Sequence, residues 1–172
     1  MKKLLYLIIL SSCFVYSQES IFIGDNVYSK TKNWKFRGSD KYLESIEVSV
    51  AKNSSYGYLI LSINTESFSD GYLNGNVIIY LNDNTTIKCV NRGKNDIANG
   101  VLTSILNLNP SEIQRLSKSR ILAIRFTIND IFESRNIIVN NEITNIGWEN
   151  GEAVFKTEYY KTNEEIKELF NN

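Results

Sequence analysis

The sequence predicts a mainly β domain of the α+β class, with antiparallel strands and two short helices. Apolar and polar residues alternate with a period of two in most segments, which is typical of strands with one buried face. Asparagine-rich turns separate these segments, because asparagine tolerates the left-handed backbone that tight turns need. Such a chain folds as an antiparallel β-sandwich or as a partly open barrel with a C-terminal helix, and the alternation favours neither.

Residues 1–17 have the layout of a cleavable secretion signal. Two lysines follow Met1, an apolar run comes next, and Ser17 precedes the expected cut. The apolar run has about 12 residues, fewer than the ~20 that a membrane-spanning helix needs. We therefore expect an exported protein, located in the periplasm, on the outer-membrane surface or in the medium.

A lipid anchor at Cys13 is the alternative for the N-terminus. Leu10-Ser11-Ser12-Cys13 fits the pattern that bacterial lipoproteins carry up to their lipid-modified cysteine. Residues 14–16 continue the apolar run, however, whereas a lipoprotein usually becomes polar after its cysteine. Cleavage after Ser17 is therefore favoured over cleavage before Cys13.

Residues 18–172 are expected to form a single β-rich domain, since no linker rich in Pro, Gly or Ser divides them. Loss of residues 1–17 leaves 17 basic and 19 acidic residues. This balance argues against nucleic acid as a partner, because nucleic acid needs a concentrated basic surface. No segment after residue 17 is apolar enough to span a membrane.

The elements follow in chain order. Residues 18–40, which include Trp34 and Phe36, are expected to be a loosely ordered entry or an edge strand. Alternation then predicts strands at 46–50, 58–63, 76–81, 85–90, 100–106 and 122–128, with two or three more within 135–157. Asn82-Asp83-Asn84 should close one hairpin, and Asn150-Gly151 another.

Two capping signals predict the helices. Asn109-Pro110-Ser111-Glu112 combines an N-cap, a first-turn proline and a capping-box glutamate, and that helix should end near residues 117–119. Thr162-Asn163-Glu164-Glu165 predicts a second capping box at the start of a C-terminal helix.

The chain has no histidine, which removes the commonest general base and the commonest metal ligand. Ser-His and Cys-His nucleophile arrangements, and zinc sites built on Cys and His, are therefore excluded. Cys89 is the one cysteine after the signal, and its strand-like surroundings predict a buried small hydrophobe. The loop-like run Asp70–Asn76 offers oxygen ligands for calcium, but a glycine-rich turn is favoured there. We predict no metal and no cofactor.

Three residues are candidates for a binding surface. Tyr58 and Tyr80 are expected on the strand face opposite the apolar rows, where exposed aromatic rings suit carbohydrate or protein ligands. The alternative, favoured by the general preference of tyrosine for strands, is that both sheet faces are covered or that the tyrosines only stiffen an exposed strand. Arg125 interrupts an apolar strand. It is expected to lie either on the solvent face or in a pocket, where it would pair with an acid or an anionic ligand.

Three segments carry a resemblance to a known group of proteins: Gly75–Cys89, Leu108–Leu116 and Ile121–Phe126. Across about residues 57–128 the chain resembles a family of exported Bacteroidota proteins to which no activity is assigned. The resemblance implies export and a strand–helix–strand order, and it implies no site.

The function that the sequence favours is a non-enzymatic binding domain at the cell envelope, with a protein or a small molecule as its ligand. Two alternatives stay open. One is a histidine-independent hydrolase that uses two carboxylates, and the other is a passive structural component of the envelope.

Overall fold

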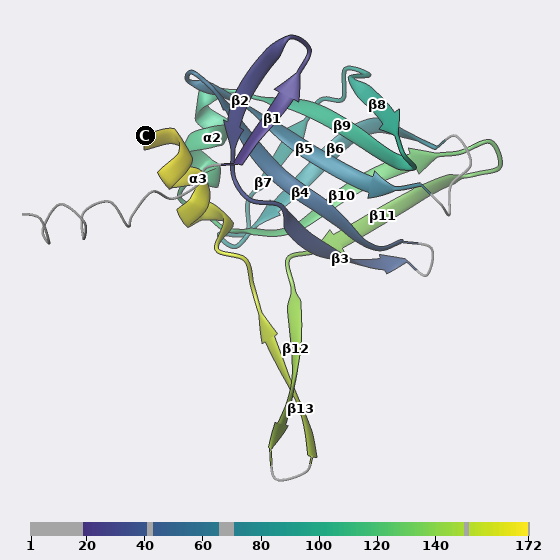
Figure 1. Ribbon diagram of the computed structural model, residues 1–172, viewed down its shortest axis with the longest axis vertical. Helices are drawn as coiled ribbons and strands as arrows, with labels where there is room; N and C mark the ends of the chain where they lie inside the picture. Colours follow the sequence, from purple (N-terminus) through teal and green to yellow (C-terminus); the bar gives the residue numbers. More distant parts are fainter. Residues whose placement is uncertain (1–18, 41–42, 66–70, 150–151, 172) are drawn as a thin grey trace, which may run out of the picture.

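The computed structural model describes residues 19–40, 43–65, 71–149 and 152–171 (Figure 1). The expected secretion signal, Cys13 and the Asn150-Gly151 turn lie outside these residues. The fold is mainly β, as predicted, with two helices among the described residues. The strands are β1 (Glu19–Ile23), β2 (Asn26–Lys30), β3 (Trp34–Asp40), β4 (Leu43–Asn53), β5 (Tyr56–Asn64), β6 (Tyr72–Leu81), β7 (Thr86–Cys89), β8 (Asn95–Ala98), β9 (Val101–Leu108), β10 (Ile121–Asn129), β11 (Ser134–Asn140), β12 (Ile143–Glu149) and β13 (Glu152–Glu158). The helices are α2 (Pro110–Leu116) and α3 (Thr162–Asn171).

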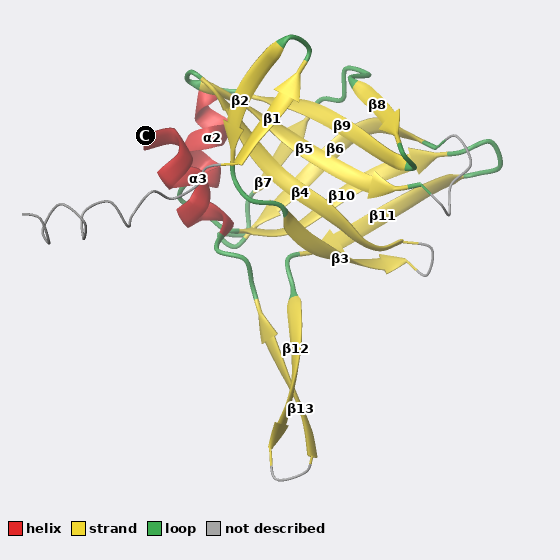
Figure 2. Ribbon diagram, viewed as in Figure 1, coloured by secondary structure: helices red, strands yellow, loops and turns green. Residues whose placement is uncertain are grey.

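One large antiparallel sheet forms the body of the protein. Its strands follow the order β7-β6-β10-β11-β3-β4-β5-β9-β8, with β2 joined to β4 and β1 to β2. The sheet curls until β7, at one end, contacts β9 near the other end, although these two strands do not pair. The result is a partly open barrel with a seam between β7 and β9, and α2 and α3 lie together at one end of it (Figure 2).

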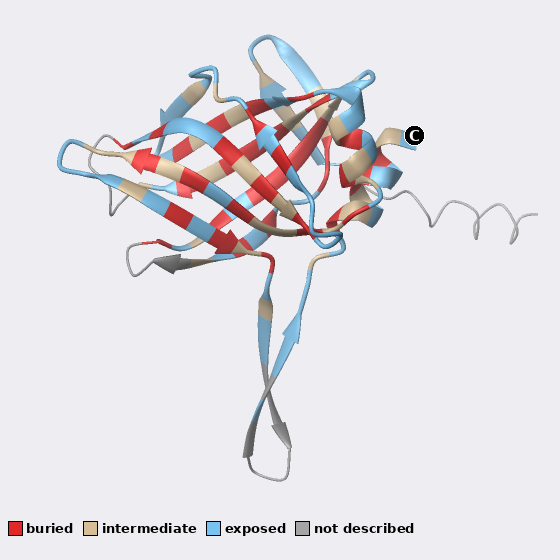
Figure 3. Cartoon of the chain, turned by 180° about the vertical axis from the view of Figure 1, so that it is seen from behind, coloured by how far each residue is buried: buried red, intermediate tan, exposed pale blue. Residues whose placement is uncertain are grey.

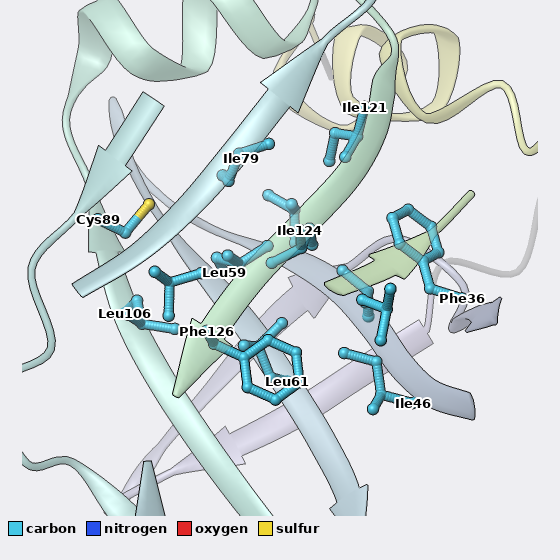
Figure 4. Close-up of a cluster of buried hydrophobic side chains, with 14 of the residues drawn as sticks. Phe36, Ile46, Leu59, Leu61, Ile79, Cys89, Leu106, Ile121, Ile124 and Phe126 are labelled. Carbon is cyan, nitrogen blue, oxygen red and sulfur yellow. The ribbon is translucent and has the colours of Figure 1, made fainter. Parts of the chain in front are cut away.

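The inward-facing rows of the strands fill the barrel. Large side chains with almost no exposure come from strands on all sides, and Figure 4 shows several of them meeting at the centre: Phe36, Ile46, Leu59, Leu61, Ile79, Leu106, Ile124 and Phe126. Alternate positions on the same strands carry polar side chains outward, as Glu47 and Lys88 do. The barrel interior is therefore a packed apolar core.

Residues 19–40, the described part of the segment 18–40, differ from the expectation of a loosely ordered entry or an edge strand. β3 lies inside the sheet between β11 and β4, and its Trp34 and Phe36 are fully buried. The two aromatic rings point inward while Lys35 and Arg37 face solvent, so the segment is a half-buried interior strand. Of the three strands in this segment, β1 alone has a single partner strand, β2, and lies at an edge as expected.

The run Asp70–Asn76 is not the glycine-rich turn that the sequence favoured. Asp70 lies outside the described residues, and Tyr72–Asn76 belong to β6. Gly75 has φ of +68°, and the β6–β10 register shifts between the pairs Arg125–Ile78 and Thr127–Asn74. Such a shift with a left-handed glycine is a β-bulge, which explains why the sequence there resembles a turn.

The first capping box is confirmed and the second is wrong. The Asn109 side chain accepts a hydrogen bond from the Glu112 N–H, and Glu112 accepts one from the Asn109 N–H. The helix α2 ends at Leu116, one residue before the predicted range of 117–119. At α3 the Thr162 hydroxyl instead accepts the Ile121 N–H at 3.0 Å. The Glu165 carboxylate accepts the Trp34 indole N–H at 3.0 Å. The Thr162 hydroxyl and the Glu165 carboxylate, which a local capping box would use, therefore bind partners from distant parts of the chain instead.

A two-stranded hairpin, β12–β13, projects from the body and is mostly exposed where its burial is described (Figure 3). Among the described residues its strands pair with each other alone. Isolated hairpins are marginally stable in water, so the root must hold this one in place. The buried Asn141 side chain does so: its amide donates to the carbonyls of Ile121 and Tyr160 at 2.7 and 3.0 Å and accepts the Tyr160 N–H at 2.8 Å.

The β6–β7 turn predicts a pH-dependent contribution to stability. Hydrogen bonds from the Ser119 hydroxyl, and from the Thr85 hydroxyl and N–H, lower the pKa of Asp83 from 3.8 to about 2. Because the folded-state pKa is depressed, the carboxylate stabilises the fold fully above its unfolded pKa, and this stabilisation is lost as the pH falls through about 2.

We expect Asp83→Asn to be less stable than the unmodified protein at about pH 6, with the gap closing between about pH 4 and pH 2. Urea unfolding followed by circular dichroism at several pH values measures the difference. A gap of the same size at both ends of this range would contradict the assignment.

Candidate functional site

A pocket of about 480 Å³ lies beside the seam of the barrel. Its walls come from the start of β5, the end of β7, the loop after β7, the end of β9 and the start of α2. The curling of the sheet brings these segments together although they are far apart in the sequence. We call it the seam pocket, and the residues that matter to its chemistry are Asn53, Tyr56, Tyr58, Lys88, Arg92, Lys94, Asn107 and Glu112.

Three cationic side chains line the seam pocket: Lys88, Arg92 and Lys94. All three residues are exposed. Within the described part of the chain, the side chains of Lys88 and Arg92 form no hydrogen bond and no ion pair. The one side-chain contact of Lys94 there places its ammonium group 5.9 Å from the centre of the Tyr58 ring. Glu112 brings the one carboxylate among the described lining residues, and its Oε2 already accepts the Asn109 N–H at 2.8 Å. The pocket therefore has an excess of positive charge.

Cys89 lies next to this pocket in the sequence but takes no part in its chemistry. The side chain is free and fully buried in the barrel core, as predicted. Burial, with a smaller contribution from the nearby Glu112 carboxylate, raises the pKa of the Cys89 thiol to about 12. A neutral thiol is neither a nucleophile nor a metal ligand, so Cys89 acts as a small hydrophobe.

Aromatic rings and amides form the remaining walls that carry binding chemistry. Tyr56 is 57% exposed, and Tyr58 is half-buried with its hydroxyl accepting the Asn53 amide at 3.0 Å. The Asn107 side chain is exposed and has no hydrogen-bond partner within the described residues. The pocket therefore offers a flat aromatic surface and a free amide beside its cations.

A second hollow of about 460 Å³ shares two walls with the seam pocket, Tyr58 and Lys94. We call it the side hollow. Tyr28, Ile105 and Asp96 also line it. The Tyr28 ring stands edge-on to the Tyr58 ring with the centres 5.4 Å apart, so the β1–β2 hairpin forms one side of this hollow.

A third hollow, of about 590 Å³, lies at the root of the β12–β13 hairpin. Lys35 and Arg37 of β3 line it together with Glu44 and Glu142. The two positive and two negative charges balance, so this hollow has no electrostatic preference for an anion or a cation.

The structure separates the three residues that the sequence singled out. Tyr58 lines both the seam pocket and the side hollow. Tyr80 and Arg125 lie together on neighbouring strands, with the guanidinium 6.0 Å from the centre of the tyrosine ring. Arg125 is exposed and lines none of the three hollows, which places it on the solvent face.

The sequence analysis missed the cations of the seam pocket. Lys88, Arg92 and Lys94 fall within seven consecutive positions, and this spacing was a usable signal. Charged residues at a strand end are usually solvated, however, so the spacing alone does not indicate a site.

In the described part of the chain, no helix has the length and apolar character needed to cross a membrane. Those residues also hold no cluster of three or more cysteine, aspartate or glutamate side chains placed to bind a metal ion. No protein-family model, no curated protein and no solved structure matches the chain.

Proposed function

We propose that this protein is an exported, non-enzymatic binding domain, and that its seam pocket holds a small anionic ligand. The observation that carries the proposal is the cluster of Lys88, Arg92 and Lys94 around one hollow, with no carboxylate paired to any of them within the described residues. The secretion signal expected at residues 1–17 supports the export part of the proposal.

The local charge supports an anion as the ligand. The whole chain has equal numbers of basic and acidic residues, so a hollow with three cations and one carboxylate is a local concentration of positive charge. Like charges around a concave surface raise the positive potential inside it, and a bound anion relieves their repulsion. Lysine and arginine also form hydrogen bonds with carboxylate, sulfate and phosphate that are stronger than those between neutral groups.

The pocket's size and lining support binding of a small molecule. Ligand pockets commonly enclose roughly 300–1,000 Å³ and combine apolar surface with a few polar groups that orient the ligand. The seam pocket, at about 480 Å³, falls within that range and joins Tyr56, Leu108 and Val90 to its cations. A hydrolase of the carboxylate type would need two acids facing one substrate bond, and Glu112 alone among the described lining residues is acidic.

The test is a titration of the purified protein with citrate and with inorganic sulfate, followed by backbone NMR. We expect the amide signals of residues 88–94 to shift and the shifts to saturate. Exchanging both Lys88 and Arg92 for glutamine should weaken binding about ten-fold, equivalent to about 1.4 kcal/mol. Added salt should weaken it further, because exposed charges are screened.

Lys118→Gln is the matched control, since Lys118 is exposed, lies outside the seam pocket and has no ion-pair partner among the described residues. It should bind both anions as the unmodified protein does. The proposal fails if neither anion shifts residues 88–94, or if the Lys88 and Arg92 exchanges leave the affinity unchanged.

A further inference from the structure

The two hollows beside the seam form one candidate path for an elongated ligand. Tyr58 and Lys94 belong to the walls of both, so a chain-like molecule that leaves the seam pocket past these residues enters the side hollow. The seam pocket has a volume of about 480 Å³ and the side hollow about 460 Å³. A free inorganic anion would use only a small part of this space.

The charges of the two hollows differ, so the two ends of a bound ligand meet different surroundings. Lys88 and Arg92 line only the seam pocket, whereas the side hollow has Asp96 to balance the shared Lys94. A negative group is therefore stabilised in the seam pocket and gains little in the side hollow. The ligand that fits therefore has an acidic group at the end that enters the seam pocket, and acidic groups further along it gain little.

Tyrosine rings and asparagine amides occur along the whole path. Tyr56 lies in the seam pocket, Tyr58 between the hollows and Tyr28 in the side hollow. The face of an aromatic ring carries negative charge, so it attracts the weakly positive C–H face of a sugar ring. The Asn107 amide in the seam pocket can donate hydrogen bonds to hydroxyl groups and accept them. The Asn95 amide in the side hollow can donate them, while its oxygen already accepts the Ser104 hydroxyl at 2.8 Å.

An anionic lipid does not fit these observations. A lipid needs an apolar channel for its acyl chain, and the interior of this barrel is packed with buried side chains such as Leu59, Leu106 and Phe126 (Figure 4). The two hollows are instead on the outside of the sheet, where residues such as Tyr56 and Asn107 are exposed.

We infer that the ligand is an acidic oligosaccharide, with its carboxylate or sulfate in the seam pocket and its following sugar units in the side hollow. The inference rests on the proposed binding function, since it names the ligand class of the same site. Lys88 and Arg92 hold the acidic group, and the tyrosines hold the sugar rings.

Calorimetric titration of the purified protein tests the inference with three acidic tetrasaccharides: tetragalacturonate, a hyaluronan tetrasaccharide and a chondroitin sulfate tetrasaccharide. Comparison probes are galacturonate monomer, neutral maltotetraose and inorganic sulfate. We expect at least one acidic tetrasaccharide to bind about ten-fold more tightly than the monomer, sulfate or maltotetraose, because it alone combines an acidic group in the seam pocket with sugar units in the side hollow.

Tyr56→Ala separates the sugar contact from the charge contact. Tyr56 is mostly exposed, so its removal leaves the core intact. We expect this variant to bind the acidic tetrasaccharide about five-fold more weakly and sulfate unchanged. Exchange of Lys88 and Arg92 for glutamine should weaken both ligands, and Lys118→Gln should weaken neither.

The outcomes distinguish this inference from the function on which it rests. If sulfate binds at residues 88–94 as tightly as every acidic tetrasaccharide, and Tyr56→Ala changes nothing, the anion site stands and the saccharide is overturned. If maltotetraose binds as tightly as the acidic tetrasaccharides, the acidic end is overturned. If no probe binds, both the inference and the proposed function fail.

Discussion

Asn141→Leu should lower the free energy of unfolding by about 4 kcal/mol. Leucine has nearly the same shape but offers no hydrogen bond, so the carbonyls of Ile121 and Tyr160 and the N–H of Tyr160 would all lose the Asn141 side chain as partner. Asn141 is fully buried, which keeps water from replacing it. A polar group left unpaired in the interior costs about 1–3 kcal/mol, and Asn141→Leu would remove the side-chain partner of three such groups.

The measurement is urea unfolding followed by circular dichroism, with the melting temperature as a second readout. A loss of this size lowers the melting temperature of a domain of about 150 residues by roughly 12 °C. Asn140→Leu is the control, because it makes the same chemical change at the preceding residue. The Asn140 side chain has no hydrogen-bond partner among the described residues. Equal losses in the two variants would show that the Asn141 hydrogen bonds do not hold the hairpin root.

The fold class was predictable because most strands of this barrel are long enough to show their alternation. β5 and β10 each present a row of inward apolar residues over nine positions, and both were expected. β3 was not, because Trp34 and Phe36 provide only two inward positions between charged neighbours, too few for a periodic pattern to stand out. β8 has no buried position, so its sequence carries no alternation at all.

The α3 capping box shows a different limit of sequence reasoning. Thr162 and Glu165 have the right spacing for a local capping box. The folded chain places the Ile121 N–H against Thr162, and the Trp34 indole and the Lys32 ammonium against Glu165. These partners come from segments distant in the sequence, so the competition between local and tertiary hydrogen bonds cannot be predicted before the fold is known.

The candidate site was predictable only in part. Tyr58 could be placed on an outward face from the alternation of its strand, and it does line the seam pocket. The pocket itself depends on how far the sheet curls, because Lys88 approaches Tyr56 only when β7 reaches β9. The alternation left a sandwich and a partly open barrel equally open, so it could not indicate that a seam would form.

Gly38→Ala should destabilise the protein by about 3 kcal/mol or more. A methyl group at Gly38 would overlap the carbonyl oxygen of Leu43 and lie 3.0 Å from its carbonyl carbon. The β3–β4 register shifts between Arg37 and Asp40, and this irregularity brings the Leu43 backbone over Gly38. Backbone atoms held in a sheet cannot rotate away as a flexible side chain could, so the two strands would have to separate at their shared end.

The control is Gly24→Ala in the β1–β2 turn, where φ is +59° and a methyl group would meet nothing within 4 Å. That change costs only the strain of a left-handed alanine, about 1 kcal/mol. Urea unfolding of the two variants therefore separates backbone overlap from backbone strain, with the larger loss expected at Gly38. A Gly38→Ala variant as stable as Gly24→Ala would mean that the strands open at little cost. The close approach of β3 and β4 would then not be what fixes the register beside the third hollow, which Gly38 lines at the root of the β12–β13 hairpin.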